Sequence, residues 1–124
     1  MDHNRAISPE DIADMIEISQ TLYRGLRYTD EKKWEERVMY FTHDLTIDFG
    51  GVKPSQIIKA SALMDWARLA YALVDTMHIS TNLDVQLHGE RATSFSYGHA
   101  RHQRTDTADY WHIYARYEHS YVRT

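Results

Sequence analysis

The stretch VDTMHISTNLDVQL, residues 74–87, decides the fold, because the spacing of apolar residues changes there. From Val74 onward apolar and polar side chains alternate, which is the period of a β-strand. The odd positions hold the apolar residues Met77, Ile79, Leu83, Val85 and Leu87. His78 is among the polar residues at even positions. The chain before residue 74 mainly has helical spacing, so helices are expected first and strands afterwards.

The segment before residue 74 predicts three helices and one short strand. Ser8 followed by Pro9 predicts the start of the first helix, since Ser is a favoured N-cap and Pro is favoured at the first helical position. Apolar residues at helical spacing continue this helix to Leu26. Asp30 is expected at the start of the second helix. The remaining elements expected here are a second helix over 31–40, a strand over 45–49 and a third helix over 57–71.

Two further strands are expected after the stretch that opens this section. His88-Gly89-Glu90-Arg91 has the composition of a hairpin turn, and it is followed by strands over 92–104 and 108–122. One face of the first of these strands carries small side chains together with His102, which leaves space beside the sheet. Helices followed by a meander of strands predict an α+β fold.

Length and composition indicate one globular domain. The chain has 124 residues, of which 43% are hydrophobic and 26% charged. Its net charge of −4 argues against nucleic-acid or anionic-membrane partners, and no apolar run is long enough for a membrane-spanning helix. The polar N-terminus, residues 1–5, predicts a cytoplasmic location. Cysteine is absent, which excludes disulfides and thiol chemistry.

Aromatic and histidine side chains are abundant, with eight His, nine Tyr and three Trp. Such side chains combine apolar bulk with a polar group, so they suit a pocket for a hydrophobic small molecule and equally suit an interface. We therefore expect a hydrophobic small-molecule substrate or ligand. The aromatic final strand also predicts contacts between copies of the chain, as a homodimer or homotrimer.

His78 and Asp30 are the residues best suited to proton transfer. A neutral imidazole is matched to proton transfer near neutral pH. If the helices pack across the sheet, Asp30 reaches one ring nitrogen of His78 and leaves the other free as a base. His102 would point into the same space as a second acid or base. In the alternative interpretation Asp30 is only a helix cap, and His78 faces solvent unless a bulge changes the register of its strand.

No metal and no other cofactor is expected. The chain has no HExxH motif and no close His pair on a predicted helix. Gly50-Gly51 is expected to form a turn, because no Lys-Ser or Lys-Thr pair follows it as in a phosphate loop. The remaining histidines, His119 among them, are expected on the surface.

Four segments together resemble the nuclear-transport-factor-2-like superfamily, in its SnoaL-like polyketide cyclase and scytalone dehydratase branch. These segments are DEKKW at 30–34, FTHD leading to IDF within 41–49, TMHISTN at 76–82 and HARHQR at 99–104. The resemblance covers residues 8–124 and implies a single cone-shaped domain, with N-terminal helices on a strongly curved, mainly antiparallel sheet. Relatives usually continue into one more strand and a tail, which this domain, 1–124, is expected to lack.

The resemblance also implies a site. In the scytalone dehydratases an Asp four residues before a Trp, a His in a Thr-x-His strand and a His in a His-Gln-Arg strand line the cavity and effect dehydration. Asp30, His78 and His102 match these positions. The hexachlorocyclohexane dehydrochlorinases are similar around 76–83 and use a comparable Asp–His pair for elimination. The implied mechanism is proton removal by His78, oriented by Asp30, with His102 or a Tyr assisting the leaving group or an enolate oxygen.

The substrate is not expected to be scytalone itself. Of the two tyrosines that activate the leaving group in scytalone dehydratases, one is replaced by Phe49, and Tyr28 is shifted relative to Asp30. The residues expected to contact a substrate are Tyr23, Tyr28, Phe49, Trp66, Asn82 and Tyr97.

Three functions agree with these features. The leading hypothesis is a cofactor-independent lyase or isomerase that abstracts a proton from a hydrophobic cyclic molecule. The alternative is a non-catalytic ligand-binding or oligomerisation module of the same fold, because one fold serves many functions. A third hypothesis is a small subunit of a ring-hydroxylating dioxygenase.

Overall fold

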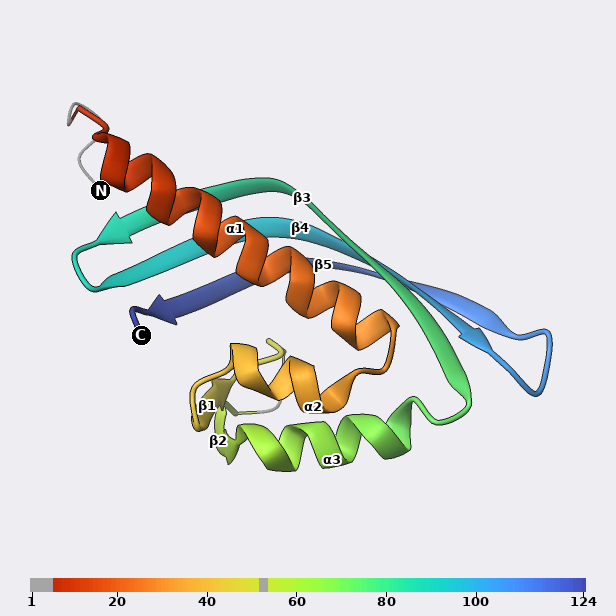
Figure 1. Ribbon diagram of the computed structural model, residues 1–124. Helices are drawn as coiled ribbons and strands as arrows, with labels where there is room; N and C mark the ends of the chain where they lie inside the picture. Colours follow the sequence, from red (N-terminus) through yellow and green to blue (C-terminus); the bar gives the residue numbers. More distant parts are fainter. Residues whose placement is uncertain (1–5, 52–53) are drawn as a thin grey trace.

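The computed structural model describes residues 6–51 and 54–124 (Figure 1). Residues 1–5, on which the expected cytoplasmic location rests, lie outside the described ranges. Within those ranges, no helix is both long enough and apolar enough to cross a membrane.

The elements follow the predicted order, helices first and long strands last. The helical elements are α1 (Pro9–Asp30), α2 (Trp34–Arg37), the 3-10 turn η1 (Val38–Tyr40) and α3 (Ala60–Ala70). The strands are β1 (Asp44–Ile47), β2 (Gln56–Lys59), β3 (Val74–His88), β4 (Arg91–Arg104) and β5 (Tyr110–Val122). Strands β1 and β2 form an antiparallel pair, and β3, β4 and β5 form an antiparallel meander in that order. This confirms the expected α+β fold.

The long strands are strongly curved, and the helices lie on one side of them (Figure 1). Helix α1 packs along β3, the edge strand of the meander. Helices α2 and α3 and the β1–β2 pair lie together below α1 in this view, and the loop end of β4 and β5 extends beyond the helices.

Helix α1 is longer than the sequence predicts, which changes the position of Asp30. The Ser8 side chain caps its start, accepting from the Asp11 N–H while the Asp11 carboxylate accepts from the Ser8 N–H. The helix continues through Asp30 because no Pro interrupts it, and Lys32, with φ of 58°, then turns the chain. Asp30 is thus the last residue of α1. The expectation that it starts the second helix was wrong.

The third helix begins later than expected. Ile57 and Ile58 form part of β2, where Ile58 pairs with Leu45 of β1, and helix α3 starts at Ala60. Adjacent β-branched residues favour a strand, and a strand partner was available. The second helix is also shorter than the predicted 31–40, since only α2 is α-helical and η1 completes it.

A β-bulge divides β3 into two halves with opposite alternation. The pairing with β4 shifts between Thr81 and Asp84, and Asn82 has a φ of 56°. Beyond the bulge the odd residue Val85 is buried, as predicted. Before it, the odd residues Met77 and Ile79 are 62% and 45% exposed. The bulge therefore lets His78, at an even position, face the inside of the cone.

The interior is filled unevenly. Trp34, Met64 and Ala67 form a buried cluster between α2 and α3, against which Phe41 and Tyr71 pack. Along β4 the buried, inward-facing residues are mostly small, namely Ala92, Ser94, Ser96, Gly98 and Ala100, and the row continues to the larger His102. Small side chains on the sheet and large ones on the helices leave space between them for aromatic side chains of β5.

Candidate functional site

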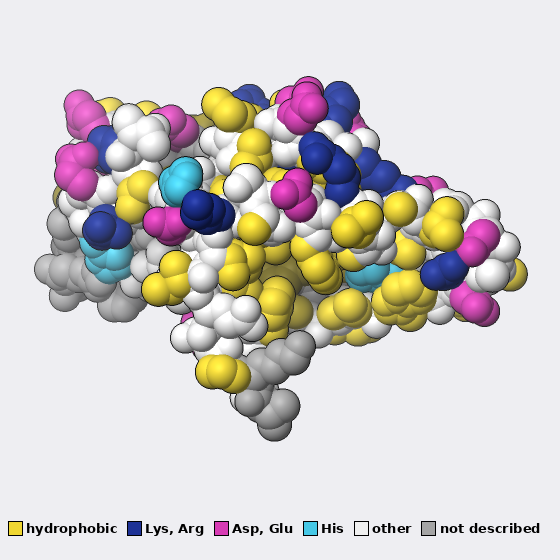
Figure 2. Space-filling view, turned by 90° about the horizontal axis from the view of Figure 1, so that it is seen from below, with side chains coloured by type: hydrophobic (Ala, Val, Ile, Leu, Met, Phe, Trp, Pro, Cys, Tyr) yellow, Lys and Arg dark blue, Asp and Glu magenta, His cyan; other side chains and the backbone are white. Residues whose placement is uncertain are grey.

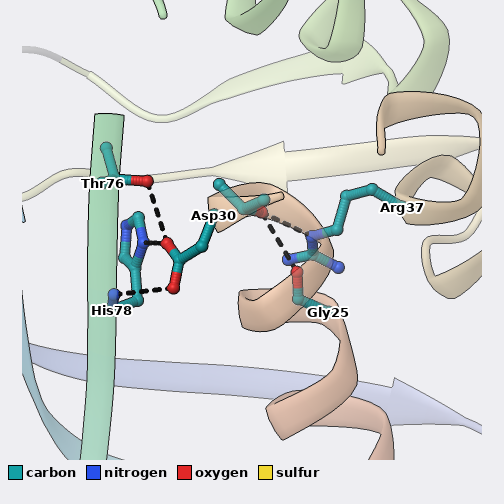
Figure 3. A network of polar contacts seen from close by, with 6 residues as sticks. Gly25, Asp30, Arg37, Thr76 and His78 are labelled. Atoms are coloured by element: carbon teal, nitrogen blue, oxygen red, sulfur yellow. Dashed lines mark hydrogen bonds and ion pairs between the residues drawn. The ribbon is translucent and has the colours of Figure 1, made fainter. Parts of the chain in front are cut away.

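The Asp30 carboxylate makes three contacts, two with His78 and one with Thr76 (Figure 3). Oδ1 of Asp30 lies 2.6 Å from Nδ1 of His78 and accepts a hydrogen bond of 2.9 Å from the Thr76 hydroxyl. Oδ2 accepts from the backbone N–H of His78 at 3.0 Å. The two side chains are 13% exposed for His78 and 21% for Asp30. The pair is therefore mostly buried yet still open to a small molecule.

The position of Asp30 is electrostatically unusual. A carboxylate at the C-terminus of a helix faces the negative end of the helix dipole, which disfavours it. Three hydrogen-bond donors, one from Thr76 and two from His78, compensate for this unfavourable interaction with the helix dipole. One of them is a backbone N–H on the free side of β3, an edge group that would otherwise need water. Asp30 thus fixes the helix to the sheet while it orients the imidazole.

His102 lies on the neighbouring strand and faces the same interior. Its ring stacks on Trp111 with centroids 5.1 Å apart and lies 6.3 Å, centroid to centroid, from the ring of His78. It is 5% exposed, and its Nδ1 has no hydrogen-bond partner among the described residues. Burial, and then the nearby His78, lower the pKa of His102, so this imidazole is neutral at neutral pH.

Sequence reasoning missed two partly buried tyrosines, Tyr71 and Tyr117. The Tyr71 ring is 6.1 Å from that of His102. Burial raises the pKa of Tyr71 and of Tyr117, and the negative charge of Asp30 raises both further, so both phenols keep their protons. Tyr117 lies across Gly98, where an added Cβ would be 2.0 Å from its ring. The row of small residues on β4 was the signal for this aromatic neighbour on β5.

The structure does not gather the six residues expected to contact substrate around this pair. Phe49 is 81% exposed in the loop after β1, and Asn82 is exposed at the bulge. Tyr97 is on the outer face of β4, where its ring meets Phe95. Tyr28 packs against Tyr40, and Tyr23 is exposed on α1. Trp66 comes nearest, because its edge contacts Tyr71.

A cavity of about 510 Å³ opens at the end of the molecule that holds the C-terminus and the β3–β4 turn. Its apolar lining includes Ile18, Met39, Phe41, Leu45, Leu87 and Tyr121. Asp30, His78 and His102 do not line it. From below, the molecule is also hollowed near its middle, with hydrophobic side chains around the hollow (Figure 2). The volume of the cavity is within the range of small-molecule sites, and its lining mixes apolar side chains with polar and charged ones.

Charged residues close one side of this cavity. Arg123, beside the C-terminus, pairs with Asp14 of α1 at 2.8 Å and with Glu90 of the β3–β4 turn at 3.1 Å. These pairs connect three parts of the chain at the rim. Within residues 6–51 and 54–124, no group of three or more His, Asp or Glu side chains is arranged to bind a metal ion.

His119 was expected on the surface, and this expectation was wrong. It lies on the inner side of β5, half-buried, and its Nδ1 is buried without a hydrogen-bond partner among the described residues. Burial, and then the positive charge of Arg37, lower its pKa. Its strand position pairs with the buried Ser94, which is why it faces inward.

Three solved structures illustrate the similarity of the fold. The Kfla4162 protein from Kribbella flavida is 26% identical, with a TM-score of 0.82 covering 90% of this chain and 82% of its own. A protein described as a candidate scytalone dehydratase from Novosphingobium aromaticivorans is 16% identical, with a TM-score of 0.81 covering 92% and 76%. ActVI-ORFA from Streptomyces coelicolor is 11% identical, with a TM-score of 0.71 covering 90% and 87%.

The family comparison covers almost the whole chain. No curated protein matches the sequence. The model of the SnoaL-like domain, which has the nuclear-transport-factor-2-like fold, matches residues 10–124. The neighbours below 25% identity show the fold alone, and that fold agrees with the match. The chain therefore belongs to the SnoaL-like domain family.

Proposed function

We propose that this protein is a cofactor-independent lyase or isomerase that removes a proton from a hydrophobic, cyclic small molecule. The observation that carries the proposal is the 2.6 Å contact between Asp30 Oδ1 and His78 Nδ1. An ionised carboxylate only accepts hydrogen bonds, so the proton of this contact belongs to Nδ1. Nε2 then keeps its lone pair, and no described residue forms a hydrogen bond with it. Nε2 of His78 is the base.

The reaction class follows from a base with no nucleophile beside it. Nε2 takes a proton from a carbon next to a carbonyl group, and the electron pair of the C–H bond moves toward that carbonyl as an enolate. In a dehydration the enolate re-forms the carbonyl, the C–O bond of a β-hydroxyl group breaks, and that oxygen leaves as water with a proton from an acid. In an isomerisation His78 returns its proton to another carbon.

Three side chains suit the second role, donation to the enolate or to the leaving oxygen. His102 is neutral and therefore carries one ring N–H, and Tyr71 and Tyr117 keep their phenolic protons. All three interact electrostatically with Asp30. A donor held in a buried place stabilises a developing oxyanion more than water does.

Proton exchange into deuterated water is the direct test, because it reports C–H cleavage whatever step follows. Cyclic ketones with and without a β-hydroxyl group would be incubated with the protein and followed by NMR. His78→Gln should lower the exchange rate by about 10²- to 10⁴-fold, the usual contribution of a general base. His88→Gln changes an exposed histidine at the end of the same strand and should have no effect. Equal rates for both variants would refute the assignment.

A ligand-binding module is the second candidate, and one observation favours it. The cavity of about 510 Å³ is lined by a mixture of apolar and polar side chains, but not by Asp30, His78 or His102. A molecule bound there would occupy the cone without meeting the base. Saturable binding of the ketones together with no exchange for any of them would favour this function over catalysis.

We also propose that copies of the chain associate through the outer face of the sheet. Tyr114 is 75% exposed there, beside the exposed Met77, Ile79 and Tyr97. His99 stacks on Tyr114 with centroids 4.5 Å apart. An aromatic, apolar face of this kind is typical of an interface.

A further inference from the structure

A second polar cluster lies in the interior, centred on the guanidinium of Arg37. Its Nε donates to the Thr29 hydroxyl at 3.1 Å, and its Cζ lies 4.1 Å from the ring centroid of Phe41. Figure 3 shows the Arg37 side chain reaching from α2 to the last turns of α1, on the opposite side of that helix from His78. Among residues 6–51 and 54–124, no carboxylate forms an ion pair with it. Burial lowers its pKa to about 10, so the charge persists at neutral pH.

The helix leaves space for this guanidinium. Gly25 is buried beneath it, and an added Cβ there would be 2.5 Å from Nη1. Phe41, on which the guanidinium stacks, lines the cavity of about 510 Å³, and so does Tyr121. Neither Nη1 nor Nη2 has a hydrogen-bond partner among the described residues. The guanidinium thus packs on a residue that lines the cavity, and two of its nitrogens are unused donors.

Neighbours on β5 add no negative charge. His119 and Tyr121 face inward there, and the positive charge of Arg37 acts on the pKa of both. The Tyr121 hydroxyl is 2.8 Å from that of Ser94. The acidic groups of the cavity are at its rim, where Arg123 pairs with Asp14 and Glu90 and where Glu17 also lies. Arg37 is partly buried, and a charge removed from water in this way favours a partner, yet among the described residues its guanidinium has only a hydroxyl and an aromatic ring.

We propose that Arg37 binds an anionic group of the substrate, so that the substrate class is a hydrophobic organic acid. This inference rests on the proposed function and extends it. The guanidinium is planar and bidentate, which suits a carboxylate.

Binding of two matched fluorescent probes tests this. Anilinonaphthalene sulfonate carries an anion, and phenylnaphthylamine has the same ring system without it. Arg37→Met should weaken binding of the sulfonate by about ten- to a hundredfold, the range expected for loss of a charge-assisted hydrogen bond, and leave the neutral probe within about twofold. The control is Arg116→Met, which removes an exposed arginine from the outer face of β5 and should change neither affinity.

Each outcome decides the proposal. The proposal is refuted if Arg37→Met leaves the ratio of the two affinities, sulfonate to neutral probe, as it is in the wild type. An equal loss of affinity for both probes is one such result. Gly25→Ala provides a second test in case Arg37→Met does not fold by circular dichroism: it displaces the guanidinium without removing it and should lower the same ratio. Because the readout is binding, a negative result leaves the exchange assay of His78 unaffected, and the two proposals fail separately.

Discussion

Replacing Asp30 by Asn removes a charge while keeping the size of the side chain, which makes it the sharpest perturbation of the site. In the wild type the carboxylate accepts from the Thr76 hydroxyl, from the His78 backbone N–H and from His78 Nδ1. An amide offers one oxygen and one NH₂ group. If the oxygen keeps the backbone N–H, the NH₂ group faces Nδ1, and the imidazole must move its proton to Nε2.

The loss of folding stability in Asp30→Asn follows from these contacts. A hydrogen bond to a charged group contributes about 1.5–3 kcal/mol, against about 0.5–1.5 kcal/mol for a neutral one. Three bonds that each lose about 1 kcal/mol give about 3 kcal/mol, and the partial exposure of Asp30 reduces this to about 2 kcal/mol. For a domain of this size the melting temperature should fall by roughly 8 °C.

Denaturant unfolding of Asp30→Asn and of Thr76→Val provides the measurement. Thr76→Val removes one donor and keeps the charge, so it should cost about 1.5 kcal/mol and leave the proton on Nδ1. The ¹⁵N chemical shifts of His78 report the position of the proton and should change only in Asp30→Asn. If Asp30→Asn is as stable as the wild type, with Nδ1 still protonated, then the carboxylate does not hold the imidazole and our reasoning fails.

Three other predictions follow from the interior and the outer face. Gly98→Ala should destabilise the fold by about 1–3 kcal/mol, because its Cβ would meet the ring of Tyr117. When Tyr117 is first replaced by Ser, Gly98→Ala should lower the free energy of unfolding in urea by less, and an equal loss in both backgrounds would contradict this reason. The pKa values of His102 and His119 are lowered in the folded state, so the unfolded chain binds more protons, and the free energy of unfolding measured in urea should decrease as the pH falls below about 6.5. If a His102→Gln, His119→Gln double variant shows the same dependence of this free energy on pH, the two histidines are not its cause. Tyr114→Glu should shift the protein to monomers in light scattering, unlike Glu118→Gln on the same face, and an unchanged mass would exclude Tyr114 from the interface.

The fold was predictable where the local sequence pattern favoured one kind of secondary structure. The alternation from Val74 to Leu87 gave β3 its bounds, and the turn at Gly89, with a φ of 68°, formed where its composition indicated. Helix ends were less predictable. Asp30 has the properties of an N-cap, but its partners Thr76 and His78 are more than 40 residues away in the sequence, and nothing local reveals them.

The site was only half visible in the sequence. Asp30, His78 and His102 were proposed from their residue types and positions and again by resemblance, and in the structure Asp30 contacts His78 while the rings of His78 and His102 lie 6.3 Å apart. Arg37 and His119 escaped notice because their importance comes from burial, which depends on the packing of α2 against α1 and on the pairing of β5 with β4. A charged residue in a predicted helix looks like an ordinary surface residue until its neighbours are known.

The bulge in β3 also separates two tasks that one strand performs. The half before Asn82 carries Thr76 and His78, which contact Asp30, and the half after it carries Leu87, which lines the cavity. Under the proposed function, the base and the cavity wall therefore belong to different halves of one strand. Substitutions at Leu87 would then change which molecules the cavity accepts while leaving the contacts between Asp30 and His78 in place.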